Sequence, residues 1–181
     1  APCANLSLNW AKFWHGFLMA SALIGTVIGS VAVGKPCDWY GRRRMMFWIA
    51  WLFLISSLGC ALAWDWYSFV VFRFLGGLGI GGASVVTPMY IAEISPAQWR
   101  GRLVALTQFN TVLGILLAYL SNYIIVTMKL GDAEWRWMFG VCAFPAVVYF
   151  LLLFNAPRSP RWLMARGREE EARQVLQRIG F

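Results

Sequence analysis

The stretch Tyr67–Ala92, "YSFVVFRFLGGLGIGGASVVTPMYIA", decides the fold. It is 26 residues long, and Arg73 is the only charged residue in it. A helix needs about 20 apolar residues to cross the hydrocarbon core of a bilayer, whereas a barrel strand needs about 10 residues of alternating polarity. The stretch therefore predicts a membrane-spanning helix, and the charge within it is a candidate functional group.

The composition of the whole chain excludes a water-soluble domain. Of its 181 residues, 60% are hydrophobic and only 13% are charged, whereas a soluble domain keeps about 25% of its residues charged. The net charge is +8, but the basic residues cluster in short segments between apolar runs and form no basic, aromatic surface of the kind that reads nucleic acid. We therefore expect an integral membrane protein that does not bind nucleic acid.

The chain carries no pattern typical of catalysis or of a bound cofactor. Its four cysteines show neither CxxC spacing nor obvious pairing, so neither a metal site nor a disulfide framework is indicated. The sequence also shows no nucleophile–base pair and no phosphate-binding loop. We expect no enzyme activity, no catalytic residues, no metal and no cofactor.

Five apolar runs are long enough to be membrane-spanning helices. None alternates as a barrel strand would, so the predicted fold class is an all-α membrane protein. The predicted transmembrane bundle covers residues 13–156, between an extracellular segment at 1–12 and cytosolic amphipathic helices at 157–181. The predicted spans lie at about 13–34, 45–64, 67–92, 103–126 and 137–154.

Basic residues between the spans predict the orientation. Twelve of the 16 Lys and Arg residues follow the first, third and fifth spans. Cytoplasmic loops of membrane proteins carry such an excess of basic residues. We therefore expect a multi-pass protein of the plasma (cell inner) membrane, with the N-terminus of the chain outside and its C-terminus in the cytoplasm. One further helix before Ala1 would let the bundle begin and end in the cytoplasm.

The last segment is predicted to form two cytosolic helices. Ser159 can cap a helix whose first position is Pro160, which favours a short helix that ends at Gly167. A second helix follows, with Glu169–Glu171 at its N-terminal end, where the helix dipole favours acids. Its apolar stripe either lies on lipid headgroups or docks against another helix. The stripe consists of Ala172, Val175, Leu176 and Ile179.

Glycines in two of the spans predict close contact between helices. Gly25 and Gly29 are four residues apart in the first span, and the third span contains Gly77, Gly81 and Gly82. Small residues at such spacing let two helix backbones approach each other in a membrane. Packing is therefore the interpretation that we favour for these residues.

Polar residues inside the spans are candidate functional groups. Arg73 either is buried with a partner or extends to the outer interface, and the neighbouring glycines favour burial. Gln108, Thr111 and Ile115 share one face of the fourth span because of their helical spacing. An amide in hydrocarbon either bonds a neighbouring helix or binds an uncharged, hydroxyl-rich ligand. The spans contain no acid, which argues against a cation site.

Several motifs together resemble the sugar porter family of the major facilitator superfamily. Gly34–Arg44, "GKPCDWYGRRR", is similar to the family's loop between its second and third helices. The run from Arg73 to Gly101 is similar to the family's fourth helix and the loop that follows, and "PRSPRWL" at Pro157–Leu163 to its signature after the sixth helix. The resemblance covers nearly the whole chain, and the motifs are specific in combination.

The resemblance implies the N-terminal six-helix half of a facilitator, lacking its first helix. It implies transport of a monosaccharide, such as a hexose or a pentose, by alternating access, as a uniporter or a proton symporter. Gln108 matches the helix-five glutamine that hydrogen-bonds the sugar, and Thr111 and Ile115 would line the cavity. The implied partners are the sugar, protons, the lipid bilayer, the missing first helix and the C-terminal half. The alternatives are an organic ion facilitator of the same superfamily and a non-transporting sugar sensor.

The resemblance also implies a cytosolic gate of ion pairs that locks the outward-open state. Glu93 and Arg100 flank the inner end of the family's fourth helix and would pair with charges of other cytosolic segments. The alternative is that these charges only set the orientation in the membrane. In proton-coupled members, the base at Arg73 pairs with an acid of the first helix. The residues implied in the gate are Asp38, Arg42, Arg43, Glu93, Arg100 and Arg161.

Two positions depart from the family's motifs. Trp39 stands where the loop motif has a base, and Arg158 stands where the signature has an acid. A base in place of an acid removes one partner of the implied gate. We therefore expect the lock to be weakened or differently paired.

Overall fold

The computed structural model describes residues 8–96, 98–129 and 131–179, and all regular structure within these ranges is helical. A helix satisfies every backbone hydrogen bond within its own segment, as an apolar environment requires. The helices are α1 (Leu8–Ala32), α2 (Gly34–Tyr40), α3 (Arg42–Leu62), α4 (Trp66–Ile94), α5 (Arg100–Thr127), the 3-10 helix η2 (Gly131–Ala133), α6 (Glu134–Val141), α7 (Ala143–Asn155), α8 (Pro160–Ala165) and α9 (Glu169–Ile179).

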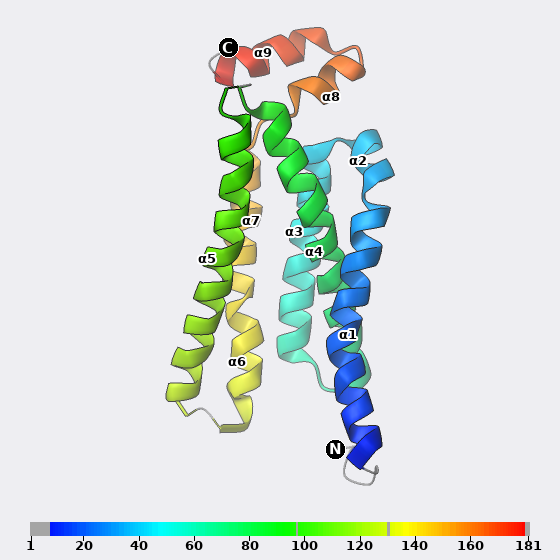
Figure 1. Cartoon of the computed structure of the whole chain (residues 1–181), viewed down its shortest axis with the longest axis vertical. Coiled ribbons are helices and arrows are strands. Elements are labelled where there is room, and N and C mark those ends of the chain that lie inside the picture. The colour runs from blue at the N-terminus through cyan, green and yellow to red at the C-terminus, as the bar shows by residue number, and fades with distance from the viewer. Residues whose placement is uncertain (1–7, 97, 130, 180–181) are drawn as a thin grey trace.

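Five helical segments of the described residues are long and apolar enough to cross a membrane, which confirms the predicted all-α class. They run along the long axis of the molecule (Figure 1). Of the expected extracellular segment 1–12, residues 1–7 lie outside the described residues, and α1 already begins at Leu8. The candidate spans are Lys12–Ala32, Arg42–Leu62, Trp66–Ile94, Arg100–Thr127 and Glu134–Asn155.

The structure differs from the sequence prediction at two connections. The segment expected as a loop after the first span forms the short helix α2. Pro36 is compatible with this helix because it lies in the first turn, where a helix tolerates proline. Gly41 then turns the chain into α3 with a φ of 86°. The last span is divided at Cys142 into α6 and α7. Pro145 lies in the first turn of α7, and its missing N–H explains why the helix restarts there.

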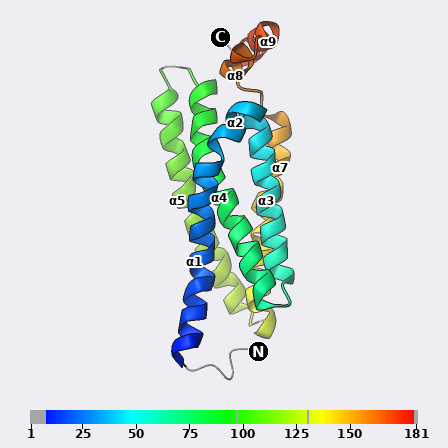
Figure 2. The same cartoon turned by 90° about the vertical axis from the view of Figure 1, so that its right-hand side faces the viewer.

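Helices α1 and α4 make the closest contact in the bundle, and both views show them crossing side by side (Figure 2). A Cβ atom at Gly77 would lie 2.1 Å from the carbonyl oxygen of Ala22, and one at Gly81 would lie 2.0 Å from that of Thr26. Gly25 and Gly29 meet the α4 backbone in the same way. The predicted packing role of these glycines is therefore confirmed.

The buried core lies where α2, α3, α4 and α7 meet. Helix α5 stands apart from it: most of its side chains are exposed, and Ile125 is its buried residue. Helices α8 and α9 lie across the end of the bundle opposite to α1's start (Figure 1). Ala172 of α9 is 1% exposed, and α9 packs against α8, which favours the docked interpretation of its stripe; the side chain of Ile179 lies outside the described residues.

Candidate functional site

A buried ion pair lies at the end of the bundle that carries α2, α8 and α9, which we call the basic end. Glu93 in the last turn of α4 accepts a hydrogen bond of 3.0 Å from Nε of Arg42, the first residue of α3. A second guanidinium nitrogen of Arg42 lies 3.0 Å from the same carboxylate oxygen. The side chain of Glu93 is 6% exposed and that of Arg42 is 13% exposed. Two helix ends are thus held together by a charge pair that water barely reaches.

Arg42 also makes a second ion pair of a different kind. Its Nη1 lies 3.1 Å from a carboxylate oxygen of Asp38, whose side chain is 69% exposed. The same nitrogen donates to the carbonyl oxygen of Cys37 at 3.3 Å. Solvent screens an exposed ion pair, so removal of Asp38 should cost less than removal of Glu93, which would leave the charge of Arg42 largely buried and unpaired.

Ser159 completes the surroundings of Glu93. Its hydroxyl donates to the second carboxylate oxygen of Glu93 at 2.6 Å. The hydroxyl oxygen of Ser159 also caps α8, because it accepts a hydrogen bond of 3.3 Å from the backbone N–H of Trp162. The cap at Ser159 was predicted from the sequence, whereas its contact with Glu93 was not. The position of Ser159 in the motif that also carries Arg158 and Arg161 is the signal that could have indicated it.

The other basic residues expected in the gate do not reach Glu93. Arg43 donates instead to the backbone carbonyl oxygens of Leu153 and Phe154 at the end of α7, at 3.4 and 2.9 Å. Arg100 and Arg161 are exposed, and neither forms an ion pair with any residue that the structure describes. Of the six expected residues, the structure thus brings Asp38, Arg42 and Glu93 together.

Arg158, the base that departs from the family signature, finds its partner in α9. It lies 3.3 Å from a carboxylate oxygen of Glu171, which also pairs with Arg168. Nearby, Nε1 of Trp162 donates to the carbonyl oxygen of Asp38 at 2.9 Å, which ties α8 to α2. Arg158 therefore pairs with the surface helix α9 and not with the acids around Arg42.

Cys37 lies under this network and is 1% exposed. Burial raises the pKa of the Cys37 thiol, and the positive charge of Arg42 only partly opposes that effect. A buried thiol with a raised pKa reacts slowly with electrophiles, because the thiolate is the reactive form. The thiol can therefore serve as a reporter of movement at the basic end.

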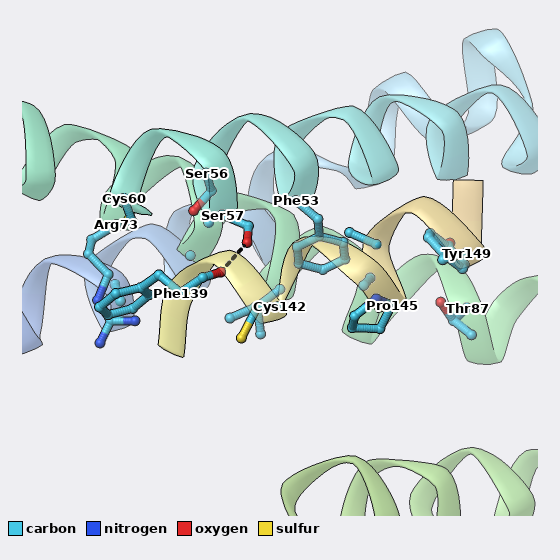
Figure 3. Close-up of a pocket in the computed structure, with 16 residues that line it drawn as sticks. Phe53, Ser56, Ser57, Cys60, Arg73, Thr87, Phe139, Cys142, Pro145 and Tyr149 are labelled. Carbon is cyan, nitrogen blue, oxygen red and sulfur yellow. Dashed lines mark hydrogen bonds between the residues drawn. The ribbon is translucent and has the colours of Figure 1, made fainter. Parts of the chain in front are cut away.

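A cavity of about 450 Å³, mainly apolar in its lining, lies between α3, α4, α6 and α7 and holds Arg73 (Figure 3). Arg73 reaches into it with its guanidinium carbon 5.2 Å from the centre of the Phe139 ring. Nε of Arg73 is buried without a hydrogen-bond partner among the described residues. An unpaired polar atom in such a place is costly, so the cavity is suited to a further polar group.

The residues expected to bind substrate lie elsewhere. Gln108, Thr111 and Ile115 share one face of α5, as their spacing predicted, and all three are exposed. The hydroxyl of Thr111 donates to the carbonyl oxygen of Thr107 within the same helix, at 2.9 Å. None of the three lines the cavity that holds Arg73. The predicted substrate-binding face of α5 and the cavity that holds Arg73 are therefore separate sites in this structure.

Apolar helices of membrane length, with a largely buried ion pair at one end and a half-buried arginine between them, define a multi-pass membrane protein. More specifically, the chain belongs to the sugar (and other) transporter family, whose model matches residues 3–180. This is a family of transporters rather than of enzymes, in agreement with the sequence analysis.

Individual relatives support the same assignment. The chain is 41% identical over 199 residues to the D-xylose-proton symporter of Escherichia coli (strain K12), covering 97% of this chain and 40% of that protein. It is 41% identical over 173 residues to the glucose transport protein of Synechocystis sp. (strain ATCC 27184 / PCC 6803 / Kazusa), covering 91% of this chain and 37% of that one. The chain spans about two fifths of the length of these relatives.

The fold agrees with that of a solved transporter. The structure matches the proton:xylose symporter XylE bound to 6-bromo-6-deoxy-D-glucose with a TM-score of 0.90 and 40% identity. The match covers 97% of this chain and 42% of the solved one. The predicted major facilitator fold is therefore confirmed for the described residues.

Proposed function

We propose that this chain is part of the N-terminal half of a transporter that moves a monosaccharide across the membrane by alternating access. The family match over residues 3–180 carries this proposal. Two relatives that are 41% identical are named for D-xylose and for glucose, so a pentose or a hexose is the substrate class that we propose. The first family helix and the C-terminal half would complete the transporter, and α5, most of which is exposed, offers them a surface.

The orientation that we propose places the basic end in the cytoplasm. Arg42–Arg44, Arg100 and Arg102 belong to this end, together with the arginines of α8 and α9. Such an excess of basic residues is retained on the cytoplasmic side of membrane proteins. The described start of α1 would then face the outside of the plasma membrane.

The contacts of Glu93 support its proposed role in a cytosolic gate. Its carboxylate holds the start of α3 through Arg42 and the start of α8 through Ser159. Ion pairs at helix ends can break and re-form when packed elements move relative to each other. Arg43, Arg100 and Arg161 remain candidates for contacts with segments outside this chain, because they form no ion pair with a described residue.

We further propose that transport is coupled to protons and that Arg73 takes part in the coupling. Nε of Arg73 is buried without a hydrogen-bond partner among the described residues, so an acid from another helix would be stabilised beside it. The D-xylose-proton symporter is 41% identical to this chain. Addition of D-xylose to cells that contain the full-length protein should make a weakly buffered medium more alkaline, whereas uptake without any pH change would contradict the coupling.

Substitution of Gln108 tests the sugar site. In the full-length protein reconstituted into liposomes, Gln108→Ala should raise KM for D-xylose or D-glucose about tenfold, because one hydrogen bond to the substrate is lost. Asn110→Ala is the matched control, since it removes an exposed amide on a different side of α5 and should leave KM within about twofold of the unchanged protein. Equal effects of both substitutions would contradict the assignment of Gln108. Uptake of an organic ion but of no sugar would contradict the proposed function.

A further inference from the structure

A second cavity at the basic end is lined by an unusual number of arginines. It has a volume of about 220 Å³ and lies between the turn from α2 into α3 and the segment that leads from α7 into α8. A water molecule occupies about 30 Å³ in the liquid, so there is room for a group of several heavy atoms. Five arginines line it: Arg42, Arg43, Arg44, Arg158 and Arg168.

The carboxylates nearby do not balance these arginines. Three acids form ion pairs with them: Asp38 and Glu93 with Arg42, and Glu171 with both Arg158 and Arg168. Arg43 contacts only backbone carbonyl oxygens through its hydrogen bonds. Arg44 is exposed and forms no ion pair with a described residue. The lining thus keeps an excess of positive charge.

The backbone adds to this positive field. Helix α3 has 21 residues and begins at Arg42. Its N-cap is Gly41, which has no side chain to accept from the first-turn N–H groups, and no acid lies in that turn. The N-terminus of a helix attracts anions through these free N–H groups and through the helix dipole. In the present case it points at a cavity that is already lined with guanidinium groups.

We propose that this cavity binds a phosphate group that carries negative charge. Guanidinium groups bind phosphate oxygens through paired, charge-assisted hydrogen bonds, and a phosphate group offers more acceptor oxygens to several arginines at once than a carboxylate does. Arg158 is essential to the argument, because an acid at this position would remove one positive charge and add a negative one. We expect Arg44 and Arg158 to contribute most to ligand affinity. Arg44 forms no ion pair with a described residue, and the pair of Arg158 with Glu171 is 41% exposed on both sides. Arg42 is held by the far less exposed Glu93, and Arg43 by two backbone carbonyl oxygens.

The position of the cavity fits a membrane lipid as the source of the phosphate. Arg42 is also the first residue of a candidate membrane span, so the cavity lies at the depth of the lipid headgroups. Tyr40 and Trp162 contribute aromatic side chains to its lining, and such residues are enriched at membrane interfaces. Basic pockets at the ends of membrane helices bind anionic headgroups. A soluble phosphate compound offers the same chemistry and is distinguished by experiment.

Native mass spectrometry of the full-length protein in a neutral detergent tests the site. The probes are phosphatidylglycerol, phosphatidylcholine as its reference lipid, and glycerol 3-phosphate with inorganic phosphate as the soluble compounds. We expect phosphatidylglycerol to bind more tightly than phosphatidylcholine. The double variant Arg44→Gln/Arg158→Gln should weaken its binding at least about tenfold, because two charged hydrogen-bond donors are lost.

A charge-matched variant separates the site from a general effect of net charge. Arg102→Gln/Arg173→Gln removes two exposed arginines from the same end of the molecule but not from the cavity. It should leave the affinity within about twofold of the unchanged protein. Hydrogen exchange provides a second readout on the unchanged protein: bound ligand should slow exchange of the first-turn amides of α3.

The outcomes decide both the site and its ligand. Binding of the lipid alone, lost in the Arg44/Arg158 variant, identifies a headgroup site. Binding of the soluble compounds as well, lost in the same variant, identifies a site for free phosphate compounds. The proposal is overturned if phosphatidylglycerol binds no more tightly than phosphatidylcholine and the soluble phosphate compounds do not bind. It is also overturned if the Arg44/Arg158 and Arg102/Arg173 double variants weaken binding equally. None of these readouts depends on sugar transport, so the site can fail while the proposed function stands.

Discussion

Arg42 pairs with two acids of very different burial, and this difference predicts two very different mutational effects. Glu93 is 6% exposed and Asp38 is 69% exposed. Removal of one partner from a buried ion pair costs about 3–5 kcal/mol, because the remaining charge stays buried. Gln at position 93 keeps one oxygen that can accept from Arg42, so we expect Glu93→Gln to weaken the closed basic end by about 2–3 kcal/mol. For Asp38→Asn we expect less than about 1 kcal/mol.

Alkylation of Cys37 measures this difference. The thiol is 1% exposed, and burial raises its pKa, so it should react with N-ethylmaleimide only when the basic end opens. When opening and closing are fast, the rate follows the open population. In the full-length protein, labelling of the Cys37 peptide should therefore accelerate about 30- to 150-fold in Glu93→Gln. In Asp38→Asn it should accelerate by less than about fivefold.

The comparison is sharp because both variants remove one negative charge next to the same arginine. Equal labelling rates in the two variants would show that burial does not decide the strength of these pairs. Faster labelling in Asp38→Asn than in Glu93→Gln would refute the role of Glu93 in holding the basic end closed. Fluorescence melting of each variant provides the control for global unfolding.

Two further substitutions test contacts described above. Gly81→Ala should destabilise the protein by about 1–3 kcal/mol in thermal melting, because its Cβ atom would lie 2.0 Å from the carbonyl oxygen of Thr26. Gly16→Ala is the control: its Cβ atom would have no atom within 4 Å, so this variant should be neutral or slightly stabilised. A loss of stability of equal size in both variants would contradict the packing argument. Ser159→Ala should lower the stability of the protein by about 2–3 kcal/mol, because the α8 cap and the hydrogen bond to Glu93 are both lost. Ser159→Thr keeps a hydroxyl and should retain most of this stability. Equal melting temperatures of the two variants would contradict the role of the Ser159 hydroxyl in both contacts.

The sequence predicted the overall fold well because membrane spans depend on length and apolarity, which are local properties. Ser159 and Pro160 identified the start of α8 for the same reason, since capping involves residues close in sequence. Helix α2 was missed, because Pro36 and Gly41 favour a turn unless the proline falls within the first turn of a helix.

The partners of the charged side chains could be predicted only in part. Arg42 and Arg43 are adjacent, and helical geometry places them about 100° apart, so only one can face Glu93. The packing of α3 against α4 and α7 decides which one does, and the sequence does not reveal it. The pairing of Arg158 with Glu171 likewise depends on how α9 docks onto α8.

The Ser159 hydroxyl links the interior of the bundle mechanically to its surface. It bonds Glu93 and the backbone of Trp162 at the same time, and Trp162 in turn holds α2 through the carbonyl oxygen of Asp38. Displacement of the α4 end would therefore leave a polar group of α8 unsatisfied unless α8 followed. A displacement that starts at this end of α4 would thereby be transmitted through α8 to α9, which packs against it.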